Sequence, residues 1–405
     1  MQRLLKNQVE KMKKPLNDLY LKVKNANLSE SNISSFSKMI SDEMRKLEYD
    51  SIKIDGLGNI VGMIKGHSNK SPLVLIANID YQDLANSNNM ELKKNNMIAF
   101  KAGLLTSIYV GSLLKSSLLP LDGNLYVCCI PRLNSGDYGI RYLFENSLKE
   151  KLSKIKGIIL CEPTARNINV GHKGRLEYEI VVKGTLGTTL LENKGINMLG
   201  AMFPLINELE RFSKGLPQNA LVGDSNLSIK NVGINRSRQP LNYKEFKVVV
   251  ERGFVPEENS VNILKKAKSI AKDVYKGQPD LQVSTALVKE KIRTYTGMSI
   301  VSKKEFRPWK IESHHNFVVT AMDALKENRS NVSIDYWKKI VTEGAYLFSE
   351  LGIPTIGFGA GSEDDIEMLK ETISVNELLK TVYEQAFIVH RSIGIPTFGW
   401  SSDEI

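Results

Sequence analysis

The sequence predicts an α/β protein in which one domain is interrupted by an inserted α+β domain. Two observations support this prediction. Short apolar runs, typical of strands buried on both faces, alternate with longer amphipathic stretches up to residue 174 and again from residue 290. Between these limits the order becomes β-α-β-β-α-β, which is typical of a small sheet with both helices on one face. We therefore expect a discontinuous α/β domain, residues 1–174 and 290–405, and an inserted domain, residues 175–289.

The expected elements follow from hydrophobic periodicity and from turn residues. In the α/β domain they are two helices within residues 1–47, strands at 51–54, 59–64, 73–76, 125–130, 157–161 and 354–358, and helices at 100–117, 139–152, 316–326 and 375–392. In the inserted domain they are strands at 176–182, 228–234, 246–251 and 281–288 and helices at 197–212 and 260–275. The alternation of strands with helices predicts a sheet with strong parallel character.

Composition limits the possible functions. The net charge is +10, but the lysines are scattered and no tract of like charges or aromatic-interleaved basic motif occurs, so we expect no nucleic-acid partner. No long apolar run occurs, and the basic N-terminal helix has no signal-peptide core, so we expect no membrane segment and a cytoplasmic location. The three cysteines, Cys128, Cys129 and Cys161, lie in predicted buried strands without CxxC spacing, which indicates reduced core thiols.

Most of the residues that stand where the predicted strands end are polar. The residues at these positions are Asn78 and Asp80, Ala99, Arg132 and Leu133, Glu162, the acidic run 363–365 and Glu367. Open α/β sheets bind their ligands at the carboxyl ends of the strands. Glu162 follows a buried strand and precedes Pro163, so its carboxylate is expected at this edge of the sheet.

Five segments carry a resemblance to a known family. They read LCEPTARNINVGHKGRLEYEIVVKG, GINMLGAMFPLINELERF, KIRTYTG, RPWKIESHH and GIPTIGFGAGSE. Through them the chain resembles, over essentially its whole length, the dizinc metallopeptidases and deacylases of the acetylornithine deacetylase, succinyl-diaminopimelate desuccinylase and carboxypeptidase G type. Within this family it resembles most the peptidases of the selenium-metabolism hydrolase branch. The resemblance implies a zinc-peptidase-like α/β/α catalytic domain with an inserted lid and dimerisation domain.

The family's chemistry implies specific ligands, several of which this sequence replaces. Two zinc ions about 3.5 Å apart share a bridging carboxylate and a water, which a glutamate deprotonates. Asn78 stands at the position of a zinc-binding His, and Ala99 at that of the bridging Asp. Arg132 aligns with the general base, and Leu133 with the zinc ligand that follows it.

Other family positions are kept or conservatively changed. Glu162 matches a zinc ligand, and Asp80 matches the Asp that supports the first ligand. Glu367 occupies the position of a zinc-binding His, four residues before Glu371, which matches the family's Glu. Thr188 stands where the lid His of the family reaches the substrate carbonyl.

Two functional hypotheses follow. In the first, the chain is a catalytically inactive homologue that holds no metal and acts as a binding, scaffold or regulatory partner. It would form a homodimer, or a heterodimer with an active paralogue, through the lid, and bind a small molecule in the inter-domain cleft. Arg132 would fill the metal space by pairing with Glu162 or Glu367, and Arg252 and Thr188 are the candidate ligand-binding residues.

In the second hypothesis, the chain is a metal-dependent hydrolase of C–N bonds in N-acyl amino acids or small peptides. Its metal, zinc, cobalt or manganese, would be held in a rebuilt site by Glu162, Glu367 and Asp80. A new metal pair formed by the adjacent His314 and His315 is a weaker alternative, because neighbouring side chains in an extended stretch point in opposite directions.

Overall fold

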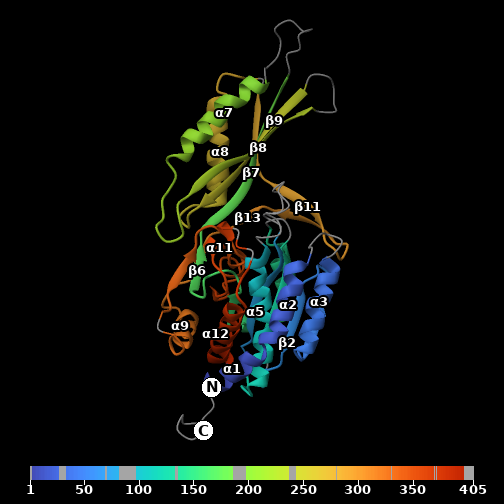
Figure 1. The fold of residues 1–405 in the computed structure, drawn as a ribbon. Helices are drawn as coiled ribbons and strands as arrows, with labels where there is room; N and C mark the ends of the chain where they lie inside the picture. The colour runs from blue at the N-terminus through green and yellow to red at the C-terminus, as the bar shows by residue number, and fades with distance from the viewer. Residues whose placement is uncertain are drawn as a thin grey trace. The chain divides into compact units, whose positions relative to one another are not determined.

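The chain forms two compact units, which the computed structural model describes at residues 2–26, 33–68, 71–81, 97–132, 136–185, 198–236, 243–279, 281–329, 331–368, 370 and 372–395. The first unit comprises Met1–Gly171, Ile292–Ile300 and Lys310–Ile405, and the second comprises His172–Lys291 and Val301–Trp309 (Figure 1). The sequence predicts the inserted domain at residues 175–289. The second unit of the structure also takes in residues 301–309, which follow the return of the chain.

The first unit is built on a mixed sheet, and the predicted α/β class is confirmed. In the described part of the chain this sheet has nine strands in the order β1-β2-β4-β3-β5-β16-β6-β14, with β15 paired to β6. The strands are β1 (Ser51–Ile54), β2 (Ile60–Ile64), β3 (Leu73–Tyr81), β4 (Leu125–Arg132), β5 (Gly157–Leu160), β6 (Ile168–His172), β14 (Trp309–Lys310), β15 (Ile334–Trp337) and β16 (Thr355–Gly357). The central strands β4, β3, β5 and β16 run parallel to one another, so their carboxyl ends meet at one edge.

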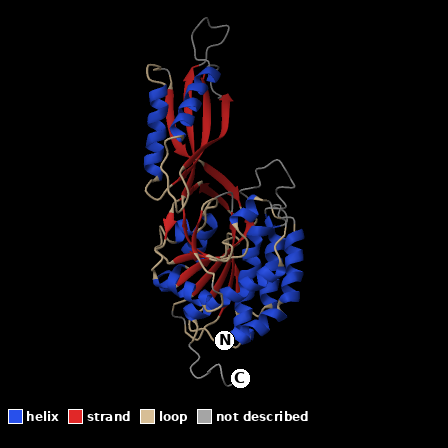
Figure 2. Ribbon diagram, turned by 60° about the vertical axis from the view of Figure 1, so that its left-hand side comes forward, coloured by secondary structure: helices blue, strands red, loops and turns tan. Residues whose placement is uncertain are grey.

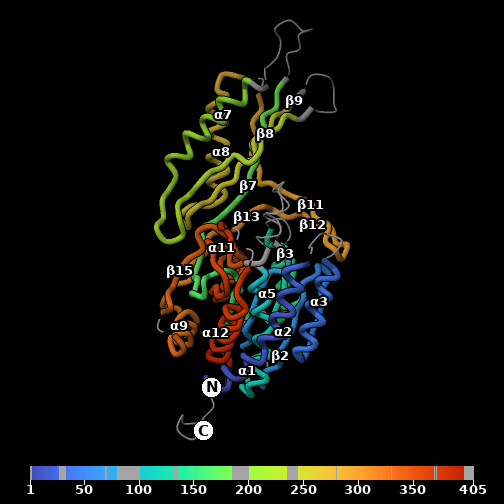
Figure 3. The backbone as a smooth tube through the Cα atoms, in the orientation of Figure 1, coloured from blue at the N-terminus to red at the C-terminus, as the bar shows by residue number. Residues whose placement is uncertain are grey.

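Helices flank this sheet (Figure 2). They are α1 (Gln2–Lys11), α2 (Lys13–Asn25), α3 (Ile33–Lys46), α5 (Met97–Ser116), α6 (Tyr138–Tyr142), α9 (Asn316–Lys326), α10 (Gly344–Leu347), α11 (Glu363–Glu367) and α12 (Val375–Ile393). Helix α5 covers β3 and packs against α12, which in turn contacts α1, so helices from both ends of the chain lie together on the sheet (Figure 3). Within the described residues, no helix is long and apolar enough to cross a membrane.

One expected helix has a different form. The sequence predicts a single helix over residues 139–152, whereas the structure has the short α6, a π-helical turn at Leu143–Ser147 and a 3-10 turn at Lys149–Lys154. Arg141 in α6 pairs with Asp137 at 2.7 Å and with Glu350 at 2.6 Å, so contacts with a distant segment hold the first turn. Tertiary contacts of this kind override local propensity.

A hairpin between residues 289 and 303 is absent from the sequence prediction. Strands β11 (Lys289–Arg293) and β12 (Ser299–Lys303) pair around the turn that contains Gly297. Apolar contact with Leu57 of the β1–β2 turn buries Ile292 and Ile300. The hydroxyl of Tyr295 also donates to the Gly58 carbonyl at 2.9 Å. The sequence of β11 is mostly charged, so it has no strand-like apolar pattern. Its one buried apolar residue, Ile292, packs against a segment more than 200 residues away.

Among its described residues, the second unit has a five-stranded antiparallel sheet in the order β10-β7-β9-β8, with β13 paired to β7. Its elements are β7 (Gly174–Thr185), α7 (Met198–Ser213), β8 (Asn226–Arg236), β9 (Tyr243–Phe254), α8 (Ser260–Val274), β10 (Gln282–Leu287) and β13 (Glu305–Phe306). The order of the first six, β-α-β-β-α-β, is the order that the sequence predicts. The two helices pack on the apolar face, whose strand residues include Tyr178, Ile180, Val182, Phe246, Val248 and Val250. The opposite face carries ion pairs such as Lys247–Glu179 at 2.6 Å.

Helix α12 carries a buried histidine that makes stability depend on pH. His390 is 9% exposed, and burial lowers the pKa of its imidazole below the usual value. Below about pH 6.5 the unfolded chain binds a proton at this residue that the folded chain does not, so stability falls as the pH falls. We expect the free energy of unfolding to decrease by up to about 1 kcal/mol between pH 7.5 and 5.5 because of this group. Urea unfolding at both pH values measures the decrease.

The matched variants are His390→Gln and His67→Gln. His67 is exposed and should leave the pH dependence of the urea midpoint unchanged. His390→Gln should flatten it. An equal slope in both variants would show that His390 does not contribute.

Candidate functional site

The candidate site lies where β3 and β5 end side by side. These strands are parallel neighbours, with Ile76 opposite Leu160. Asn78 and Glu162 each stand two residues further on, so the register brings them together. Both side chains are buried, at 3% and 2% exposed. The sequence predicts both residues at the carboxyl edge of the sheet, whereas the adjacency of β3 and β5 comes from the structure.

The Asn78 amide donates a hydrogen bond to the Glu162 carboxylate, from Nδ2 to Oε1. The orientation of the amide follows from charge, because the opposite orientation would place the Asn78 Oδ1 oxygen against a carboxylate oxygen. Oδ1 itself is buried and has no hydrogen-bond partner among the described residues. Asn78 therefore presents a donor to Glu162, where a metal-binding imidazole would present a lone pair.

The turn after Glu162 is fastened to the segment that follows β16. Thr164 Oγ1 accepts a hydrogen bond from the Gly359 amide at 3.0 Å and donates to the Gly359 carbonyl at 3.2 Å. The buried Trp337 donates from Nε1 to the Pro163 carbonyl at 2.8 Å. A Cβ at Gly359 would lie 2.3 Å from the Glu162 carbonyl oxygen, so only glycine permits this approach. The backbone around Glu162 is consequently held from two sides.

A buried cluster of ion pairs continues this support. Glu384 of α12 lies between two arginines, 3.7 Å from Arg166 Nε and 3.4 Å from Arg329 Nε. Burial raises the pKa of the Glu384 carboxyl, and the two guanidinium groups act in the opposite direction. Arg329 also donates to the Arg166 carbonyl. The cluster ties the turn that bears Glu162 to α9 and α12, which the sequence analysis does not anticipate.

Glu367 lies apart from the buried pair. It is the last residue of α11, its side chain is 67% exposed, and it forms an ion pair with Lys339. The neighbouring Glu363 accepts hydrogen bonds from the backbone amides of residues 338, 339 and 340. The acidic run therefore anchors a surface loop, and the structure does not bring Glu367 to Glu162.

Several predicted positions have no described side chain. Ala99 lies in α5, Asp80 in β3 and Arg132 at the end of β4, and only their backbone positions are described. The remaining three, Leu133, Thr188 and Glu371, lie outside the described residues. The predicted pairing of Arg132 with Glu162 and the roles of Asp80 and Thr188 therefore stay predictions.

Arg252 of β9 lies on the helix-bearing face of the second sheet. It is 1% exposed and pairs with Glu258 at 2.7 Å. Its Nη1 donates to the carbonyl oxygens of Asn226 and Gly253. The guanidinium thus has a structural role beside its predicted role in ligand binding. The sequence signal for this position is the alternation of side chains along β9. Phe246, Val248 and Val250 face the helices, and Arg252 continues the same every-second-residue series.

The described residues do not fit a dinuclear zinc centre. Asn78 points an amide N–H at Glu162, the alanine at position 99 has no lone pair, and Glu367 is engaged at the surface. No group of three or more His, Cys, Asp or Glu suited to a metal occurs within the part of the chain that the structure describes.

Comparisons with known proteins agree on one family. The model for peptidase family M20/M25/M40 matches residues 74–389. The Escherichia coli K12 protein YgeY is 24% identical over 346 residues, which cover 80% of this chain and 81% of YgeY. A probable carboxypeptidase of Aspergillus niger is 26% identical over 160 residues, 38% of each chain.

Solved structures share the fold. The dipeptidase Dug1p of Saccharomyces cerevisiae has a TM-score of 0.70 at 12% identity, covering 97% of this chain and 98% of its own. The Bacillus subtilis protein YxeP, a dinuclear metal-binding peptidase, has a TM-score of 0.66 at 14% identity, covering 94% and 98%. At these identities the likeness establishes the fold.

Proposed function

Because the chain belongs to peptidase family M20/M25/M40, we propose that it keeps the family's fold but has exchanged dizinc hydrolysis for a binding function. The observation that carries this proposal is the hydrogen bond from Asn78 to Glu162. It joins two positions that the resemblance aligns with zinc ligands, and the Glu162 Oε1 oxygen accepts from the Asn78 amide. By the resemblance, Asn78 and the alanine at position 99 stand where water activation needs a terminal imidazole and a bridging carboxylate.

A binding function implies a partner or a small ligand. We propose a homodimer, or a heterodimer with an active paralogue, formed through the second unit as a dimerisation domain. The order of the described strands leaves β8 at one end of the sheet, and an edge strand of this length is suited to pairing with another chain. As the alternative to a protein partner, we propose a small molecule that binds in the inter-domain cleft expected from the family resemblance.

A second function is a metal-dependent hydrolysis of C–N bonds in N-acyl amino acids or small peptides. The family match and the peptidase neighbours favour this function over the first. The buried Asn78 Oδ1 and the Glu162 carboxylate would give a metal oxygen donors, which suit a hard cation such as manganese better than zinc. Cobalt and zinc are the other ions to test.

Metal analysis separates the two functions. Protein purified without a histidine tag is incubated with zinc, manganese or cobalt, desalted and measured by elemental analysis. For the binding function we expect near-zero occupancy with all three ions and no cleavage of a panel of N-acyl amino acids and dipeptides. One or two ions per chain, with cleavage, would establish the hydrolase instead.

Two carboxylate variants sharpen this test. Glu162→Gln should abolish any metal-linked cleavage, because it removes a buried charged oxygen donor. Glu367→Gln is the matched control, because that carboxylate is exposed and paired with Lys339. Cleavage lost in Glu367→Gln as well would indicate that α11 moves to join the site.

A further inference from the structure

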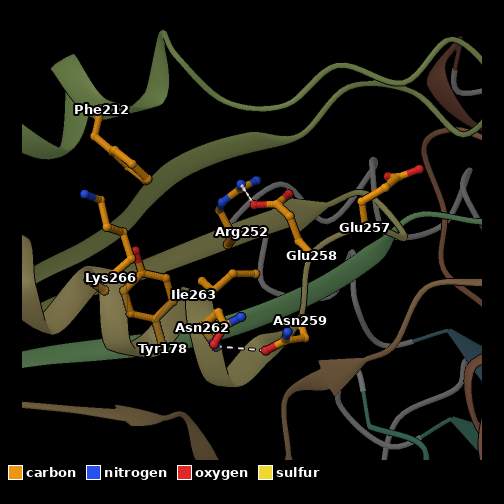
Figure 4. A pocket seen from close by; sticks show the side chains of 10 residues that line it. Tyr178, Phe212, Arg252, Glu257, Glu258, Asn259, Asn262, Ile263 and Lys266 are labelled. Atoms are coloured by element: carbon orange, nitrogen blue, oxygen red, sulfur yellow. Dashed lines mark hydrogen bonds and ion pairs between the residues drawn. The ribbon is translucent and has the colours of Figure 1, made fainter.

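A small cavity lies on the helix-bearing face of the second unit (Figure 4). Its volume is about 250 Å³. It is lined by Tyr178, Phe212, Arg252, Glu257, Glu258, Asn259, Asn262, Ile263, Lys266 and Ala267. Ligand sites for drug-sized molecules measure about 300–1,000 Å³, so this cavity is suited to a compact molecule.

One half of the cavity is apolar. Ile263 and Ala267 are one helical turn apart on α8, so both face the sheet. Phe212, near the end of α7, lies across from them, and the ring of Tyr178 on β7 forms part of the floor (Figure 4). These four side chains come from three elements of the unit's own core and provide a preformed surface for an apolar body.

The same half carries a cation. Lys266 lines the cavity from α8, and its Nζ lies 5.8 Å from the centre of the Phe212 ring. Lys266 is exposed at the surface. Its side chain can therefore turn toward a ligand without breaking buried contacts. The hydroxyl of Tyr178 points toward Phe212 (Figure 4), which adds a hydrogen-bond donor beside the ammonium group.

The acidic residues that line the cavity have partners, and Glu208, whose charge acts on Lys266 from outside the lining, pairs with Arg211 at 2.7 Å. Both Glu258 oxygens have partners, because Oε1 pairs with Arg252 at 2.7 Å and Oε2 accepts from Ser225 Oγ at 2.6 Å. Glu257 accepts from Asn219 Nδ2 at 3.5 Å, and its carboxylate points away from Lys266 (Figure 4). Lys266 therefore provides the charge that a ligand meets beside the apolar wall.

We propose that this cavity binds a compact monocarboxylate with an apolar body, whose carboxylate pairs with Lys266 and whose body lies against Phe212, Ile263 and Ala267. The site belongs wholly to the second unit and does not use Asn78 or Glu162. It is thus separate from both proposed functions of the sheet edge, and its test requires neither metal nor hydrolysis.

Benzoate is the probe, with benzyl alcohol and benzylamine as uncharged and cationic molecules of similar size. Isothermal titration calorimetry on the full chain should give saturable binding of one benzoate. Binding of benzyl alcohol should be at least about tenfold weaker, because it lacks the charge-assisted hydrogen bond to Lys266. Absence of saturable benzoate binding, or equal binding of benzylamine, would overturn the proposal.

Three variants locate the site. Lys266→Ala should weaken benzoate binding about tenfold, whereas Lys265→Ala, the exposed neighbour that does not line the cavity, should leave it unchanged. Ala267→Phe should abolish binding by filling the apolar half. If Ala267→Phe fails to fold, the comparison of Lys266 with Lys265 decides, and equal affinities in these two variants would refute the assignment.

Discussion

Replacing Gly103 with alanine is expected to destabilise the protein by about 3 kcal/mol, because the added methyl group would overpack against backbone. Gly103 lies in α5, and a Cβ built there would be 1.6 Å from the Cys161 carbonyl oxygen. The strand end that carries this oxygen is held in the central sheet, because the Cys161 amide donates to the Ile76 carbonyl at 2.8 Å. Alanine favours a helix over glycine by about 1 kcal/mol, which is too little to compensate.

The control is Gly233→Ala in β8. A Cβ at Gly233 would meet no atom within 4 Å, so this change should be neutral or slightly stabilising. Urea unfolding followed by circular dichroism compares the two variants. A Gly103→Ala protein as stable as the Gly233→Ala protein would mean that α5 can shift away from β5, and that the approach of the helix to the residue before Glu162 is not fixed.

Removing the charge of Glu258 is expected to cost about 3 kcal/mol, because it leaves the guanidinium of Arg252 buried without its counter-ion. Arg252 is 1% exposed, and burial lowers its pKa while Glu258 acts in the opposite direction. Glu258→Leu should therefore lower the urea midpoint strongly. The exposed pair of Glu208 and Arg211 provides the control, and Glu208→Leu should change the midpoint little.

A double-mutant cycle tests the physical reason. If the cost arises from an uncompensated charge, Arg252→Met in the Glu258→Leu background should restore part of the stability. If the double variant is less stable than Glu258→Leu alone, the hydrogen bonds from Arg252 to the Asn226 and Gly253 carbonyls outweigh the charge. The cycle thus separates ion pairing from the role of Arg252 in joining β8 to β9.

The fold was largely predictable, because the hydrophobic pattern and the turn residues within each segment indicate most of its helices and strands. The helix expected at residues 316–326 and the strand expected at 51–54 have the same bounds in the structure, as α9 and β1. The hairpin of β11 and β12 was missed because Ile292 and Ile300 become core residues only through Leu57, far away in the chain. A local pattern cannot report a contact of that kind.

The candidate site was predictable only in part. The strand pattern placed Asn78 and Glu162 at strand ends, and the parallel register of β3 and β5, which the pattern does not show, brings them together. The engagement of Glu367 with Lys339 was not predictable, since both are charged residues of surface segments that meet only in the folded chain. The support that Trp337 gives to the turn after Glu162 was not predicted either. Its hydrogen-bond partner is the Pro163 backbone carbonyl, and a backbone group cannot be identified as a partner from residue types.

The three buried thiols give this chain a built-in reporter of how its central sheet opens. Cys128 and Cys129 lie in β4, Cys161 follows β5, and burial raises the pKa of each thiol. Only the thiolate attacks an alkylating reagent, so none of the three can react while the strands remain closed. The rate of alkylation in native buffer therefore measures the frequency of strand separation beside Glu162, without an introduced label.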